Sequence, residues 1–402
     1  MINKQQKIIR VITDFSFVSF IFTEMFLRYT IISQFSILLF CSIFILNCLR
    51  KSKIYFDTFF TLSLLLIILS MFQSISGVSI SSYTTNEMTK TLITNFFVAL
   101  ATYNYLIDSK DIEKNLNIFA GFGLLLSFFI AFLTFQSGYI DRFGSEISIN
   151  IFGKYVSYNS NDIALISGFS FLFYLYKFSC YKKSKVTIIL VWLFAIILLT
   201  GSRKGLLLLS IGALIILVLM NRKNIIKNIF LIISFGSLCY LIIFYVPFFY
   251  QVIGIRIEAL FNLFNGNAIN EASAATRNLY ILRGWISFLE KPWLGYGFDC
   301  FRHLPYSYGT YSHNNYIELL ISGGIPAFFF YYYPRVKALL ILKNKWRQEK
   351  INVLFIAYLI GLLIIEIGMV SYYDRIYIIV FVFVISSYKK IKLKKLGGSV
   401  NE

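Results

Sequence analysis

Long apolar runs, separated by short polar segments, follow one another along the chain. A bilayer core about 30 Å thick needs about 20 residues of helix, and lipid admits only helices or closed barrels, so each long run predicts one membrane helix. The pattern therefore predicts an all-α, polytopic integral membrane protein with about 12 transmembrane helices. The expected spans are 11–29, 31–49, 55–73, 88–107, 116–136, 161–178, 186–200, 204–220, 228–246, 313–333, 351–368 and 372–388.

Two of the polar segments, 137–160 and 247–312, are longer than the rest. The second is too poor in apolar residues in its middle to cross the bilayer. It is therefore expected to be one large extracytoplasmic loop that contains short amphipathic helices. The expected organisation is transmembrane helices 1 to 9 over 1–246, the large loop over 247–312, helices 10 to 12 over 313–388, and a basic cytoplasmic tail over 389–402.

Composition supports a membrane protein, because 58% of the residues are hydrophobic and only 14% are charged. Such a balance excludes an ordinary water-soluble globule. The net charge of +19 would suggest nucleic acid as the partner of a soluble chain. Here the basic residues lie in short clusters between apolar runs, as in cytoplasmic loops, so no nucleic-acid partner is expected and both termini are placed in the cytoplasm. The five cysteines have no metal-like spacing, so neither a disulfide framework nor a zinc site is expected.

Several cations lie where the positive-inside pattern predicts few of them, on the outer side. Arg203 and Lys204 precede one membrane helix, and four arginines lie in the large loop. The planar guanidinium binds phosphate oxyanions through two parallel hydrogen bonds. The alternative for each arginine is a lipid head-group contact or an ion pair with a nearby acidic residue. The loop arginines are Arg256, Arg277, Arg283 and Arg302, and the acidic residues are Glu258, Glu271, Glu290 and Asp299.

Segment 276–291 has the apolar periodicity of an amphipathic helix that lies on the membrane or on other helices. Arg283 falls on another face of this helix, where it is suited to a surface pair. Arg277 lies over Gly284, where the missing side chain is expected to leave room for a ligand. The apolar stripe consists of Leu279, Leu282, Ile286 and Leu289.

Two helix starts on the outer side are predicted to carry chemistry. Ser312 is expected to cap a helix with His313 in its first turn, where the helix dipole disfavours a positive imidazole. His313 should then be neutral near pH 7 and available as a base. In the same way Ser202 is expected to cap a helix that begins with Arg203, which makes an anion site. A single histidine is more often structural than catalytic, but its position opposite an arginine-rich loop favours the catalytic interpretation.

Common nucleotide and hydrolase motifs are absent from the sequence, namely the GxxxxGKS/T, HExxH and GxSxG patterns. The short Gly201–Gly205 turn is no nucleotide loop, and it is predicted on the side of the membrane that lacks ATP. A transfer reaction on that side needs a donor that arrives already activated on a lipid.

Three local motifs occur in a fixed order. Thr200-Gly-Ser-Arg-Lys-Gly205 precedes a membrane helix, Arg277 is followed by Trp285, Pro292 and the Gly295-Tyr-Gly297 turn, and His313-Asn314 is followed by Leu319-Leu320 and Gly324-Ile325. Together they resemble the O-antigen ligase and Wzy-type polysaccharide polymerase superfamily. These are bacterial integral membrane glycosyltransferases that act on undecaprenyl-diphosphate-linked glycans. Ser322 and Ala327 depart from the family pattern, in which an acidic residue and a glycine are common.

The resemblance implies a polymerase in the bacterial cytoplasmic membrane. It would transfer an undecaprenyl-diphosphate-linked glycan to a sugar hydroxyl of another lipid-linked repeat unit, without a cofactor or metal. The implied catalytic residues are Arg203 and Arg277, which stabilise the departing diphosphate, and His313 as general base. The implied partners are membrane lipid, a chain-length regulator and a flippase. Lys204, Arg283, Arg302 and Asn314 are the implied substrate-binding residues, and Glu318, Asp299 and His303 are rival bases.

Two other functions stay open. The first is a ligase of the same family, which moves a finished glycan to another acceptor. The second is a transporter or flippase of lipid-linked oligosaccharide, which should hold ionisable residues at mid-membrane. The candidates here cluster at helix ends instead, and Asp14, Asp57 and Glu366 are the interior charges that would serve a transporter.

Overall fold

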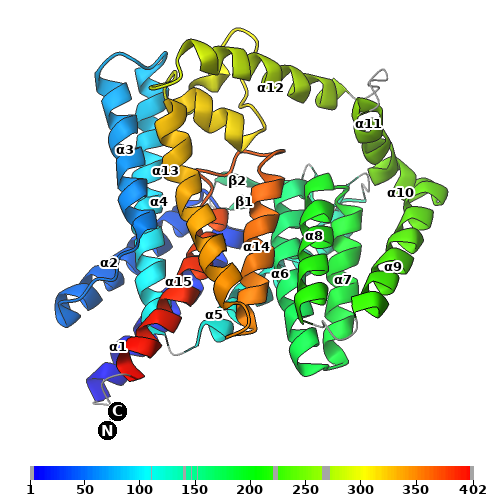
Figure 1. The fold of residues 1–402 in the computed structure, drawn as a ribbon, viewed down its shortest axis with the longest axis horizontal. Helices are drawn as coiled ribbons and strands as arrows, with labels where there is room; N and C mark the ends of the chain where they lie inside the picture. The colour runs from blue at the N-terminus through cyan, green and yellow to red at the C-terminus, as the bar shows by residue number, and fades with distance from the viewer. Residues whose placement is uncertain are drawn as a thin grey trace. The chain divides into compact units, whose positions relative to one another are not determined.

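The structure is a computed structural model that describes residues 4–109, 111–138, 142–145, 147–151, 153–220, 225–264 and 272–398. The described chain is mostly helical (Figure 1). It divides into two compact units. The first unit comprises Met1–Phe40, Asp111–Ala268 and Leu342–Ile364, and the second comprises Cys41–Lys110, Ile269–Ile341 and Ile365–Glu402.

The first unit is built around α6, which packs against α5, α7 and α8. Helices α6, α7 and α8 run side by side (Figure 1). The elements of this unit are α1 (Lys4–Phe26), the first part of α2 (Ile31–Lys51), α5 (Ile112–Ser137), α6 (Ser160–Tyr181), α7 (Lys185–Leu199), α8 (Arg203–Met220), α9 (Ile225–Tyr245), α10 (Pro247–Phe249), the π-helical η2 (Tyr250–Gly254), α11 (Ile255–Phe264) and most of α14 (Ile351–Ile365).

Small residues allow α6 and α8 to approach closely. A Cβ added at Gly205 of α8 would lie 2.7 Å from the Cβ of Ala164 on α6, and one added at Gly212 would overlap Leu172. Close approach through small residues is how membrane helices gain van der Waals packing without a hydrophobic driving force. The start of α8, where Arg203 lies, is therefore anchored on a tightly packed helix pair.

One short hairpin departs from the all-α prediction. Strands β1 (Ser148–Ile151) and β2 (Lys154–Ser157) pair antiparallel within the polar segment 137–160, with Ile149 opposite Val156. The Asn150 side chain accepts a hydrogen bond from the Gly153 N–H at 2.9 Å, which closes the turn. Each strand has only four residues, and β1 is only partly buried, so the hairpin leaves no clear pattern in the hydropathy of the sequence.

The second unit holds α4, which packs against both α3 and α15. Asp57 caps α3 by accepting from the Phe59 N–H, and its other carboxylate oxygen accepts from the Tyr388 hydroxyl of α15 at 3.0 Å. The elements of this unit are the rest of α2, α3 (Thr58–Ile75), α4 (Ser82–Asp108), α12 (Ala272–Glu290), the 3₁₀-helical η3 (Cys300–His303), α13 (Asn315–Lys345) up to Ile341, and α15 (Arg375–Gly398).

Every span expected from hydropathy overlaps a helix of the structure. Among the described residues five helices, α2, α3, α5, α6 and α8, are long and apolar enough to cross a membrane, while α7 and α14 are shorter apolar helices. The segment 247–312 contains short helices and the longer α12. The chain is thus a mostly helical protein of membrane type, and the count of about 12 spans and their orientation stay predictions.

Candidate active site

The helix that follows His313 begins later than expected. Asn314, and not Ser312, is the cap, because its side-chain oxygen accepts from the Tyr316 and Ile317 N–H groups at 3.0 and 3.1 Å. The Ser312 hydroxyl instead donates to the Asn314 carbonyl at 2.8 Å. His313 therefore precedes α13, and the prediction that it lies in the first turn is wrong. Ser312 and Asn314 both favour a cap in the local sequence. Hydrogen bonds that this segment makes with Glu318 and Ser371 decide between them.

His313 has a φ of 57°, in the left-handed region. This conformation costs a non-glycine residue roughly 1–2 kcal/mol, so neighbouring contacts must hold it. The Ser312 N–H donates to Glu318 Oε2 at 2.8 Å, and the Glu318 side chain is fully buried. On the other side, the Asn315 side chain accepts from the Ser371 and Tyr372 N–H groups at 2.9 and 3.0 Å. The segment that presents His313 is thus held on both sides by buried hydrogen bonds.

Two tyrosine rings lie near the imidazole ring of His313. The Tyr311 ring centroid lies 4.3 Å from that of His313, and the Tyr280 ring lies parallel to the imidazole at 6.4 Å. Tyr280 is held in place because its hydroxyl donates to the Ser307 carbonyl at 2.8 Å. Arg277 lies one turn before Tyr280 on the same face of α12. Arg277 thus lies one helical turn from the tyrosine whose ring is parallel to the His313 imidazole.

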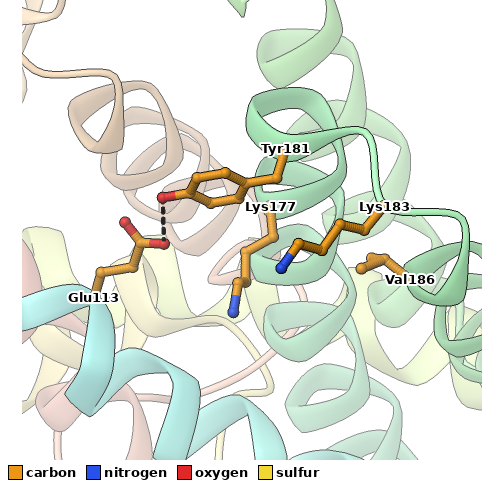
Figure 2. A pocket seen from close by; sticks show the side chains of 5 residues that line it. All are labelled: Glu113, Lys177, Tyr181, Lys183 and Val186. Atoms are coloured by element: carbon orange, nitrogen blue, oxygen red, sulfur yellow. Dashed lines mark hydrogen bonds between the residues drawn. The ribbon is translucent and has the colours of Figure 1, made fainter.

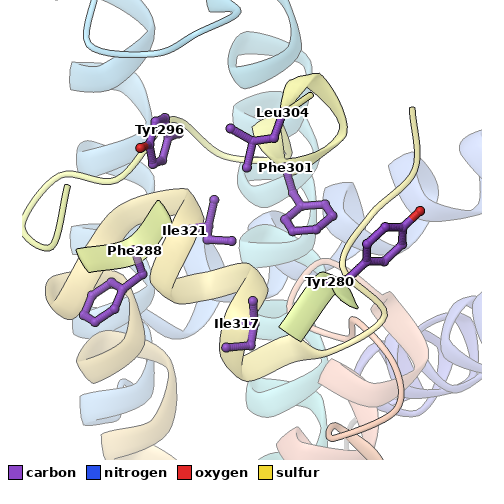
Figure 3. Close-up of a cluster of buried hydrophobic side chains, with 7 residues drawn as sticks. All are labelled: Tyr280, Phe288, Tyr296, Phe301, Leu304, Ile317 and Ile321. Atoms are coloured by element: carbon purple, nitrogen blue, oxygen red, sulfur yellow. The ribbon is translucent and has the colours of Figure 1, made fainter. Parts of the chain in front are cut away.

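The face of α12 that is buried is not the one predicted from the apolar stripe. Tyr280, Gly284 and Phe288 are buried, and a Cβ added at Gly284 would lie 2.5 Å from Ile317 of α13. The expected room for a ligand beside Gly284 is therefore wrong, because α13 side chains fill it. The buried cluster that joins α12 to α13 consists of Tyr280, Phe288, Tyr296, Phe301, Leu304, Ile317 and Ile321 (Figure 3).

The predicted apolar stripe of α12 is mostly exposed. Leu282, Ile286 and Leu289 are 59%, 52% and 58% exposed, and Leu279 is half-buried. Arg283 is exposed as well, as expected for a surface position. The stripe is expected to lie either on the membrane or on other helices. Its exposure shows that it does not pack on other described helices of the second unit.

The turn after α12 interlocks with a break in α13. Gly323 and Gly324 have non-helical φ and ψ, which frees the carbonyls of the preceding residues. The Tyr296 and Gly297 N–H groups donate to the Ile321 and Ser322 carbonyls at 2.7 and 3.0 Å. Gly324 has a φ of 66° and a Cβ there would overlap the Pro292 carbonyl, so no other residue fits. Two of the motifs that carry the family resemblance are thus joined by hydrogen bonds.

Arg302 is engaged in an ion pair. Its Nη2 donates to Asp299 Oδ1 at 2.7 Å, which is the structural alternative considered for the loop arginines. Burial raises the pKa of the Asp299 carboxyl above its ordinary value, although Arg302 acts in the opposite direction. His303, a rival base, shares a hydrogen bond of 2.8 Å with the Thr84 hydroxyl of α4. Both contacts order the loop around η3.

Arg203 and Lys204 begin α8 in the first unit. Ser202 caps α8 as predicted, since its hydroxyl accepts from the Gly205 N–H at 3.4 Å and donates to Asn161 of α6 at 2.9 Å. Arg203 Nη1 donates to the Arg256 carbonyl at 2.9 Å. Gly201 has a φ of 59°, and a Cβ there would lie 2.6 Å from the Val252 carbonyl, so the turn needs glycine.

Sequence reasoning missed Arg142 as a member of this turn. Its Nε donates to the Thr200 carbonyl at 2.9 Å, so Arg142, Arg203 and Arg256 come from three separate segments to one place. The sequence contains one signal for Arg142: it is a cation in an outer segment, where the positive-inside pattern predicts few cations. In the second unit the missed residues are Tyr280, Tyr311 and Asn315, for which the sequence carries no specific signal.

The candidate residues are therefore divided between the two units. The first holds Arg203 and Lys204, and the second holds Arg277, Arg283, Arg302, His313 and Asn314. Asn314 acts as a helix cap, and Arg302 is paired with Asp299. The prediction that all of them serve one extracytoplasmic site stays a prediction.

The comparisons with known proteins agree with the motifs. A family model described as O-antigen ligase matches residues 188–332, which begin within α7 and end within α13. No curated protein matches the chain. The matched range includes Arg203, Arg277 and His313 and both interlocked motifs. Residues 188–332 are thus similar to the O-antigen ligase family, and the resemblance to the O-antigen ligase and Wzy superfamily is confirmed over this segment.

Proposed function

We propose that the protein is a polysaccharide polymerase in the bacterial cytoplasmic membrane. It transfers a glycan from undecaprenyl diphosphate to a sugar hydroxyl of another lipid-linked repeat unit at the outer face. The observation that carries the proposal is the match to the O-antigen ligase family over the segment that contains Arg203, Arg277 and His313. A flippase that delivers the repeat units and a chain-length regulator are the proposed protein partners.

In the proposed reaction, the bond between the anomeric carbon and the diphosphate oxygen breaks, and its electron pair leaves with the lipid diphosphate. Arg203 and Arg277 stabilise the charge that develops on this leaving group, a task suited to preorganised guanidinium groups. Lys204 and Arg283 assist as further cations. Arg302 is a weaker helper, because Asp299 already engages its guanidinium.

The acceptor hydroxyl forms the new bond to the anomeric carbon, and its proton passes to His313. The held turn supports this role, since Glu318 and Asn315 fix the backbone on either side of His313. The fully buried Glu318 is a poorer base, because an acceptor hydroxyl cannot reach a carboxyl group that the protein encloses. A positioned general base contributes typically 10²–10⁴-fold to the rate.

A ligase is the second candidate, since the matching family model is described as O-antigen ligase. The two reactions share the donor and the leaving group and differ only in the acceptor. A purified preparation decides between them when it is offered the lipid-linked repeat unit as both donor and acceptor. Polymer formation supports the polymerase, and transfer only to a different acceptor supports the ligase.

The test of the proposed residues uses purified protein and a defined lipid-linked repeat unit. Arg203→Ala, Arg277→Ala and His313→Ala should each abolish polymer, with membrane abundance unchanged, since losing one charge-stabilising donor or the base costs about 10²-fold or more. Arg277→Lys should also fail, because lysine cannot form the bidentate contact. Arg50→Ala, at the exposed end of α2, is the matched control and should polymerise normally. Normal chain length in all three alanine variants would refute the assignment.

A further inference from the structure

The first unit contains a cavity at the opposite end of α6 from the arginine turn. It has a volume of about 260 Å³ and is lined by Glu113, Lys177, Tyr181, Lys183 and Val186 (Figure 2). Asn161, which bonds Ser202, lies at the start of α6, whereas Lys177 and Tyr181 lie at its end. At 1.5 Å per helical residue the two places are separated by roughly 25–30 Å. The cavity is therefore independent of the proposed reaction centre.

The lining of the cavity carries more positive than negative charge. Figure 2 shows the Lys183 ammonium group extending toward Lys177. Lys177 Nζ donates to the neutral Asn117 amide oxygen at 3.1 Å, so this bond does not neutralise its charge. The one lining carboxylate, Glu113, accepts from the Tyr181 hydroxyl at 3.3 Å and from the Tyr176 hydroxyl at 3.5 Å. Two ammonium groups thus face a cavity whose single carboxylate is already hydrogen-bonded.

The helices that meet at the cavity also expose apolar side chains farther along their length. On α5 Leu125 and Phe128 are exposed, and on α7 Ile188 and Val191 are exposed. The two helices are in contact there, because the Phe128 ring stacks on Trp192 of α7 at 4.3 Å. A cationic cavity at the end of helices that expose apolar side chains farther along fits an amphiphile, whereas a soluble anion would use only the cavity.

We propose that this cavity binds the phosphate-bearing head group of an anionic membrane lipid. Lys177 and Lys183 contact the phosphate, the Tyr181 ring forms the rim, and the acyl chains lie on the exposed faces of α5 and α7. Basic pockets between membrane helices recognise anionic head groups through the same combination of cations and apolar surface. The lysines belong to segments that the charge pattern places on the cytoplasmic side, so the lipid belongs to the inner leaflet.

Binding is measured by native mass spectrometry of the purified full-length protein, with short-chain phosphatidylglycerol and phosphatidylcholine as probes. Phosphatidylglycerol should bind saturably and phosphatidylcholine at least about tenfold more weakly. The Lys177→Gln/Lys183→Gln variant should lose about tenfold in phosphatidylglycerol affinity. The matched control is Lys182→Gln/Lys185→Gln, which removes the same charge from neighbouring positions that do not line the cavity and should bind like the wild type. Glu113→Gln should bind more tightly, because it removes the one negative charge of the lining.

Three results would overturn the proposal. They are equal binding of the two lipids, equal affinity of the lining and control variants, and displacement of the lipid by millimolar inorganic phosphate, which would identify a soluble anion as the ligand. The melting temperatures of both double variants are measured alongside, so that misfolding is not taken for lost binding. Since the readout is lipid binding, its failure leaves the proposed polymerase untouched, and a failed polymerase assay leaves the lipid site untouched.

Discussion

Each residue of the Ser312–Asn314 turn has a different partner. The Ser312 N–H is held by the buried Glu318 carboxylate, the His313 ring lies near the rings of Tyr311 and Tyr280, and Asn314 caps α13. A left-handed residue between two anchored neighbours has little freedom to reorient. The turn thus fixes the backbone from which the imidazole projects, which favours the proposed role of His313 as a general base.

Replacing Glu318 distinguishes a positioning residue from a base. Glu318→Gln keeps an acceptor for the Ser312 N–H and should retain most of the polymerisation rate and its pH profile. Glu318→Ala leaves that buried N–H without its acceptor, at a cost of about 1–3 kcal/mol, and should lower kcat more than it changes KM. Kinetics with the lipid-linked repeat unit measure both. If Glu318→Gln were as inactive as Glu318→Ala, Glu318 would be the base and the role of His313 would be wrong.

Replacing Asn314 tests whether its side chain serves the helix or the substrate. Asn314→Ala should lower the free energy of unfolding by about 0.5–2 kcal/mol, because the cap is lost. Asn314→Ser restores a capping oxygen and should recover both stability and KM. Thermal unfolding of the purified protein and donor titration provide the two measurements. A raised KM in a fully stable Asn314→Ser variant would show instead that Asn314 contacts the glycan.

Helix α12 has one side packed against α13 and one side exposed. Its Tyr280 and Phe288 side pins it to α13, and the turn that follows it fills the break at Gly323 and Gly324. Its other side exposes apolar residues and Trp285, and the exposed Trp293 follows at the helix end. Tryptophan and leucine beside cations such as Arg283 and Lys291 are typical of a helix that lies in the membrane interface. We infer that α12 rests at the lipid surface.

Fluorescence tests this placement of α12. A Trp192→Phe/Trp346→Phe variant keeps only Trp285 and Trp293 as emitters. In vesicles of brominated lipids, bromines near the head groups should quench this emission more strongly than bromines deep in the acyl chains, because an interfacial helix is buried only about 5–10 Å. A variant that keeps only Trp192, which stacks on Phe128, serves as the comparison. Emission unaffected by bromine at any depth would contradict contact with lipid.

At the scale of the whole molecule, two of the three interior acids that would serve a transporter lie at helix ends, and Asp14 lies within α1. Asp57 caps α3 and binds Tyr388, while Glu366 follows the end of α14 and accepts from Tyr331 and Ser371 at 2.7 and 2.6 Å. Both acids therefore act at helix ends as partners of neighbouring side chains. A transporter is expected to use such groups at mid-membrane.

Orientation in the membrane is the decisive test at this scale. In a variant whose native cysteines are replaced by serine, Lys204→Cys and Arg283→Cys should react with an impermeant maleimide in intact cells. Lys183→Cys and Lys389→Cys should react only after the membrane is opened, because their segments follow the positive-inside pattern. Labelling of positions 204 and 283 from opposite sides would exclude a shared extracytoplasmic reaction, whatever the sugar or acceptor.

The sequence by itself determined features that depend on neighbouring residues or on overall hydropathy. These include the helices under each apolar run, the helix over 276–291, the Ser202 cap of α8 and the order of the family motifs. Helix caps and hydrophobic periodicity act over a few residues, so a linear pattern contains them.

Only the tertiary structure decided which of several locally acceptable arrangements is used. Asn314 rather than Ser312 caps α13, Ile317 fills the space beside Gly284, and Arg142 reaches the turn before Arg203. Each result depends on hydrogen bonds or packing between segments that are distant in the chain. Burial favours the arrangement in which every polar group finds a partner, and those partners are brought within reach only by folding.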